Sequence, residues 1–99
     1  MNEGVYLNLR TFLELDDFSA RDAKIFAFVL GAFLGMYPAI EVDFKGVKVT
    51  QNALNMLYDT LSYLYGVDKA ISVYCTNTGY DKTQYVSEYI IKPINKTIC

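Results

Sequence analysis

An uncharged apolar run over residues 25–36 (IFAFVLGAFLGM) constrains the fold of this chain more than any other feature. A helix needs about 20 apolar residues to cross a bilayer, so this run is too short to span a membrane. It suits a helix packed on the core of a globular domain. The chain has 99 residues and is 53% hydrophobic, which fits one folded domain and excludes a disordered segment. We expect a single domain over residues 1–99, with residues 95–99 as a tail.

The charged residues argue against a nucleic-acid or anionic-membrane partner. Nine Lys and Arg oppose eleven Asp and Glu, a net charge of −2, whereas such partners favour a basic surface. The chain has no histidine, which removes the commonest general base and metal ligand. The phosphate-loop, dinucleotide-binding, nucleophile-elbow and paired-cysteine motifs do not occur in the sequence. We therefore expect no catalytic residues, no metal site and no cofactor.

The two cysteines and the first residues indicate the compartment. Cys75 and Cys99 suit reduced thiols, because a disulfide scaffold in so short a chain normally uses four or more cysteines. Residues 1–4 carry no positive charge and are not followed by the apolar core of a signal peptide. We predict a cytoplasmic protein in which Cys75 is a small buried hydrophobe.

Hydrophobic periodicity predicts alternating strands and helices. Alternation with period two predicts strands over residues 5–9, 40–44 and 71–75, with residues 11–17 as a connector or strand extension and 47–49 as a short extension. Helices are predicted over residues 19–36, 51–65 and about 82–92, with Ser19 and Asp22 as a capping box, Thr50 as a cap and Gly66 as a stop. The order β-α-β-α-β-α predicts an α/β fold. Because the strands alternate, we expect a two-layer sandwich, a small and mainly parallel sheet with helices on one face.

The predicted helix 19–36 carries a stripe with two open interpretations. This stripe is the least hydrophobic side of the helix, and beyond Lys24 it has no charge; its members are Arg21, Lys24, Phe28, Gly31 or Ala32, and Gly35. Either neighbouring helices of the same domain cover it, or it is a surface for association. In the second case Phe28, Gly31 and Gly35 form an oligomer interface, and the protein is a structural homo-oligomer, for which we expect a homodimer.

The second predicted helix and the second predicted strand each present a polar face. The outward positions of the helix are Asn52, Asn55, Met56, Asp59, Ser62 and Tyr63, which suit either a solvated or a recognition face. On the strand, Glu41 and Asp43 share a face, and paired carboxylates can perform acid–base or metal chemistry. An alternative is that Asp43, near a strand end, bonds the following loop. A small enzyme or nucleotide-binding protein using these two acids is a third hypothesis.

Two short motifs resemble a known family. They are Ser19, Arg21, Asp22 and Ala23 at a helix start, and Asp43, Phe44, Gly46 and Val47 at a strand end. Together they resemble the STAS-like domain family of unknown function, which is related to STAS domains and anti-sigma-factor antagonists. The resemblance covers roughly residues 11–75. It implies a non-enzymatic regulatory domain that binds a protein partner, such as a kinase-like ATPase regulator.

The resemblance also implies a docking surface at the loop after the Asp strand and the start of the next helix. Here that surface comprises Thr50, Gln51, Asn52, Asn55, Met56 and Asp59. In anti-sigma-factor antagonists a hydroxyl in this loop is phosphorylated, and Thr50 is the candidate in this chain, with helix capping as its alternative role. The hairpin that opens a STAS domain is reduced here to one strand, and such a trimmed sheet favours dimer formation.

Overall fold

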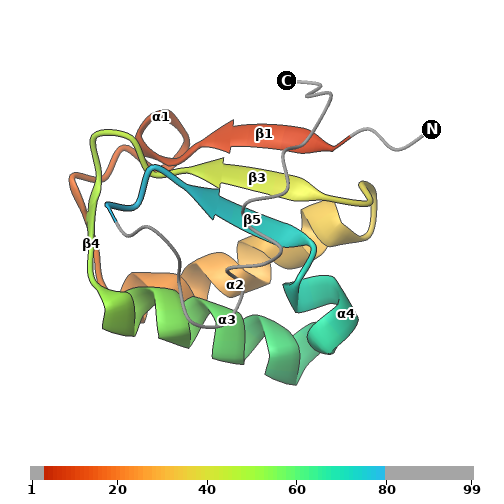
Figure 1. Ribbon diagram of the computed structural model, residues 1–99. Coiled ribbons are helices and arrows are strands. Elements are labelled where there is room, and N and C mark those ends of the chain that lie inside the picture. Colours follow the sequence, from red (N-terminus) through yellow and green to blue (C-terminus); the bar gives the residue numbers. More distant parts are fainter. Residues whose placement is uncertain (1–3, 80–99) are drawn as a thin grey trace.

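Three parallel strands and two long helices build the domain. A computed structural model describes residues 4–79 of the chain. Strands β1 (Val5–Asn8), β3 (Ile40–Asp43) and β5 (Val73–Thr76) form a sheet in the order β1-β3-β5. Helices α2 (Ala20–Leu34) and α3 (Gln51–Tyr65) lie side by side on one face of it (Figure 1). The prediction of a two-layer α/β sandwich with a small parallel sheet and helices on one face is confirmed.

The alternation of side chains along the strands separates a buried face of the sheet from an open one. The inward residues, which lie over the helices, are all buried: Val5, Leu7, Ile40, Val42, Val73 and Cys75. The register aligns the outward residues in two rows, one of Tyr6, Glu41 and Tyr74 and one of Asn8, Asp43 and Thr76. The predicted wetter face is therefore the side of the sheet away from α2 and α3 (Figure 1).

A second, two-stranded sheet lies at the carboxyl end of the three-stranded sheet. Strands β2 (Asp17–Phe18) and β4 (Lys48–Val49) pair in parallel. Phe18 packs edge-on against Phe26 of α2, with 5.8 Å between ring centroids, and against Phe44, at 5.3 Å. All three rings are buried. This cluster fixes the loop after β3 against the start of α2.

The helix starts follow the capping chemistry predicted for them. The Ser19 hydroxyl accepts from the backbone N–H of Asp22, and the Asp22 carboxylate accepts from the backbone N–H of Ser19. The Thr50 hydroxyl accepts from the backbone N–H of Ala53. Helix α3 ends before Gly66, whose φ of 96° requires a residue without a side chain.

Two short helices occupy segments that the sequence pattern assigned differently. Helix α1 (Leu9–Leu13) replaces the end of the first predicted strand and part of the connector that follows it. It forms because the Asn8 side chain accepts from the backbone N–H of Thr11 and caps a single turn. Helix α4 (Val67–Ala70) precedes the third predicted strand, and that strand, β5, therefore begins at Val73 instead of residue 71. The helix predicted at 82–92, the tail at 95–99 and Cys99 lie outside the described residues.

Candidate functional site

The outer side of α2 carries a row of exposed apolar residues, here called the α2 stripe: Ile25, Phe28, Ala32, Gly35 and Met36. Their spacing of three and four residues places them along one side of the helix. Ile25, Phe28 and Met36 are 58%, 62% and 71% exposed. The opposite side of α2 is buried in the core through Ala23, Phe26, Ala27, Leu30 and Leu34. The helix is apolar on both sides, but residues 4–79 cover only one of them.

Gly31 and Gly35 lie in different surroundings, although they are one turn apart. A Cβ atom added at Gly31 would lie 2.1 Å from the hydroxyl oxygen of Tyr65 in α3. One at Gly35 would meet only carbonyl oxygens of its own helix, the nearer at 3.8 Å. Gly31 therefore contacts a side chain of its own domain, as the first interpretation of the stripe had it, whereas Gly35 and Phe28 stay exposed.

Positive charge lies near both ends of the α2 stripe. Arg21 and Lys24 are exposed in the first turns of α2, and its last turn contains no basic residue. The carbonyl of Leu34, near the end of α2, accepts from the Lys69 ammonium at 3.3 Å. Because the carbonyl end of a helix favours positive charge, Lys69 is well placed there, and basic side chains therefore lie near both ends of the stripe.

The surface implied by the STAS-like resemblance lies at the start of α3. Thr50, Asn52 and Asp59 are exposed. The side-chain amide of Gln51 donates to the side chain of Asn55 at 3.2 Å. Met56 is half-buried and packs against the core. The surface is therefore mainly polar. The most exposed apolar side chain on α3 is Tyr63 at 87%, which lies further along the helix.

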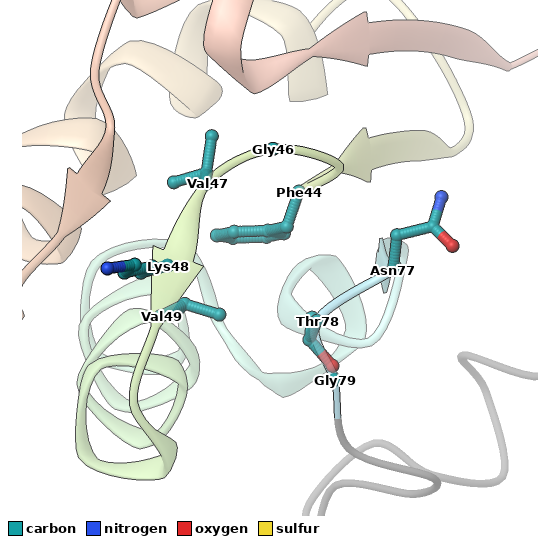
Figure 2. Close-up of a pocket in the computed structure, with 8 residues that line it drawn as sticks. All are labelled: Phe44, Gly46, Val47, Lys48, Val49, Asn77, Thr78 and Gly79. Carbon is teal, nitrogen blue, oxygen red and sulfur yellow. The ribbon is translucent and has the colours of Figure 1, made fainter.

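A shallow hollow of about 630 Å³ lies beside that surface, at the carboxyl ends of the strands. Its lining comes from Phe44, Gly46, Val47, Lys48, Val49, Asn77, Thr78 and Gly79. Figure 2 shows that these residues come from the loop after β3, from β4 and from the loop after β5. The lining carries one charged side chain, that of Lys48.

Asp43 joins the ends of neighbouring strands on the open face of the sheet. One of its carboxylate oxygens accepts from the Tyr6 hydroxyl, and the other from the backbone N–H of Lys45 at 2.9 Å and the Asn77 amide at 2.8 Å. Asp43 thus bonds the following loop, as one interpretation of the sequence has it. Its neighbour Glu41 accepts from the Thr76 hydroxyl at 3.0 Å.

These contacts set the ionisation of Asp43 and Tyr6. Burial acts to raise the pKa of Asp43, but the hydrogen bonds from Tyr6, Asn77 and Lys45 outweigh it and hold the pKa below its ordinary value. The same hydrogen bond, to a carboxylate, raises the pKa of the Tyr6 hydroxyl. Asp43 is an ionised, hydrogen-bonded group. Within residues 4–79, no three His, Cys, Asp or Glu side chains gather where they could hold a metal ion.

Sequence reasoning identified Phe28, Gly35 and, as an alternative to Gly31, Ala32, but it missed Ile25 and Met36 as members of the stripe. Because residues 25–36 are apolar at every position, hydropathy alone does not separate the inner from the outer side. The signal that separates the two sides is the charge of Arg21 and Lys24, from which the three–four spacing continues through Phe28 to Ala32 and Gly35.

Known proteins add nothing to this description: no family model, curated protein or solved structure matches the chain. The resemblance to STAS-like domains therefore rests on the residues quoted for it and stays a prediction. Across residues 4–79, none of the helices combines the length and the apolar character that crossing a membrane requires.

Proposed function

We propose that this chain is a non-enzymatic protein-binding domain and that the α2 stripe is its binding surface. One observation carries the proposal: Ile25 and Phe28 on the outer side of α2, and Met36 in the turn just after it, are each more than half exposed. Exposed apolar patches of a few hundred Å² are often functional surfaces. We further propose that the domain acts in the cytoplasm, in keeping with the predicted reduced thiols.

A photoreactive aromatic amino acid in place of Phe28 tests this proposal in cells that produce the chain. The same group in place of Tyr63 is the matched control, since that side chain is still more exposed but lies on α3. We expect covalent protein adducts from position 28 well above those from position 63, identified by mass spectrometry. Equal yields at the two positions would overturn the proposal.

The start of α3 is a second candidate surface, for a regulatory partner of the STAS-like kind such as a kinase-like ATPase regulator. It is favoured by the placement of Asn52, Asn55 and Asp59 along one side of the helix, next to the exposed Thr50. A variant with Asn55→Arg and Asp59→Arg is expected to lose such a partner in affinity capture. If the variant captures the partner as well as the wild type does, the proposal for the α3 surface is wrong, and the proposal for the α2 stripe is unaffected.

A further inference from the structure

We infer that the occupant of the α2 stripe is a second copy of this chain, with the two α2 helices packed antiparallel about a twofold axis. The inference rests on the proposed function, and it specifies the partner and the geometry. Three properties of the stripe support it: the distribution of large and small side chains, the distribution of charge, and the amount of apolar surface.

Up to Gly35, large and small residues are segregated along the stripe, and the large Met36 follows in the turn after α2. Ile25 and Phe28 lie toward its start, and Ala32 and Gly35 follow toward its end. An antiparallel pair centred near residue 30 brings Phe28 over the partner copy's Ala32 and Ile25 over its Gly35. Phe28 and Ile25 then each meet a small residue, as well-packed interfaces require, and Met36 lies near the partner copy's Lys24. A parallel pair would instead set Phe28 against Phe28 and leave a gap at Gly35.

The charges favour the same direction. In the antiparallel pair, Arg21 and Lys24 of one copy lie at the opposite end of the interface from those of the other copy, and Lys69 already donates to the Leu34 carbonyl at the carbonyl end of each α2. In a parallel pair the four positive side chains would gather at one end. Because each copy offers the same surface, a twofold axis perpendicular to the helices forms every contact between the two copies twice.

The exposed apolar area of the α2 stripe is comparable to the apolar area that one partner buries in a dimer interface. Side chains as large as those of Ile25, Phe28 and Met36 present roughly 150–200 Å² each when free. At the exposures given above, they leave on the order of 350 Å² of apolar surface on each copy. A standard interface buries about 800 Å² per partner, a little over half of it apolar. The stripe thus supplies most of the apolar part.

Light scattering of the purified full chain over a range of concentrations gives the first test. We expect a mass twice the 11.2 kDa of one chain, and the mass of one chain for Phe28→Asp, with an unchanged circular dichroism spectrum. Tyr63→Asp is the matched control and should remain a dimer. A wild-type chain that stays monomeric overturns the second copy as occupant.

Cross-linking tests the direction of packing. All variants carry Cys99→Ser, which leaves Cys75 buried in the core. The double variant Ile25→Cys with Gly35→Cys should give a covalent dimer with a bismaleimide reagent that spans the ~8–10 Å between packed helices. Each single variant should not, because equal positions in the two copies lie roughly 15 Å apart. A covalent dimer from Ile25→Cys alone overturns the antiparallel arrangement.

The outcomes separate this inference from the proposed function. If position 28 gives adducts with other proteins while the pure chain stays monomeric, the α2 stripe is a binding surface for a different partner and the inference fails alone. If position 28 gives no adducts above the control and the chain is monomeric, both fail. Gly35→Cys is suitable as a probe because its Cβ meets only ordinary van der Waals contacts.

Discussion

Asp43 holds the carboxyl ends of β3 and β5 together through side-chain and backbone hydrogen bonds, and its ionisation is part of that contact. Because its pKa is lower in the folded chain than in the unfolded chain, the unfolded chain binds more protons between the two values. The carboxylate therefore stabilises the fold at neutral pH, and this contribution is lost as the pH falls below about 4.

Asp43→Asn is expected to lower the free energy of unfolding by about 1–3 kcal/mol at pH 7, because charged hydrogen bonds are lost. It should also flatten the decline in stability on acidification. Urea unfolding at a series of pH values from 7 to 3 measures both effects. An acid decline as steep in the variant as in the wild type would show that Asp43 does not contribute to it.

Tyr6 has the opposite dependence on pH. Its pKa is raised in the folded chain, chiefly by the hydrogen bond to Asp43, so its contribution is present below about pH 10 and is lost above that value. We expect Tyr6→Phe to be less stable at pH 7 and to lose less stability between pH 9 and 11. Tyr74→Phe, from the same row of the sheet, is the matched control. If Tyr6→Phe loses as much stability between pH 9 and 11 as the wild type does, Tyr6 is not the group responsible for that loss.

Among the elements, α2 and α3 depend on one close approach. Gly31 leaves room for the Tyr65 ring, and a methyl group there would displace it. We expect Gly31→Ala to lower the free energy of unfolding by about 1 kcal/mol, because this overpacking exceeds the gain in helix propensity. In a Tyr65→Ala background the same change should stabilise the fold by about 0.5–1 kcal/mol, since only the propensity gain remains.

Chemical denaturation of the four proteins in this cycle gives the coupling energy between Gly31 and Tyr65. A change of sign between the two backgrounds identifies Tyr65 as the neighbour that requires a glycine. If Gly31→Ala stabilises both backgrounds equally, the ring does not pack there. Gly35→Ala, made in the Phe28→Asp chain that we expect to be monomeric, is the control, because the surroundings of Gly35 within its own domain are open.

The elements also show how far local sequence determines this structure. The starts of α2 and α3 were predictable because Ser19 and Thr50 cap their helices through contacts within three residues. Strands β1, β3 and β5 were predictable because one face of their sheet is buried and the other is open, whereas the pairing of β2 with β4 was not. Helix α1 was not, since a single turn has little periodicity to detect and depends on the Asn8 cap. The contact between Gly31 and Tyr65 joins distant segments, and no local pattern encodes it.

In the whole molecule, the buried residues of the sheet and of both long helices form one hydrophobic cluster. Cys75 belongs to this cluster, and burial raises the pKa of its thiol to about 12. A thiol reagent attacks the thiolate, so both the low thiolate fraction and the exclusion of the reagent protect Cys75 in the folded chain. Because the core is continuous, exposing this residue requires most of the domain to open.

We therefore expect Cys75 in a Cys99→Ser chain to react with an aromatic disulfide reagent only through unfolding. At a stability of about 5 kcal/mol, labelling should be roughly 5,000 times slower than in the unfolded chain. The free energy derived from labelling should match that from urea unfolding, and it should fall with urea at the same slope. Labelling that is much faster and insensitive to urea would mean that β5, an edge strand of the three-stranded sheet, opens on its own. The core would then consist of two cooperative units, with α2 and the first two strands of the sheet as the more stable one.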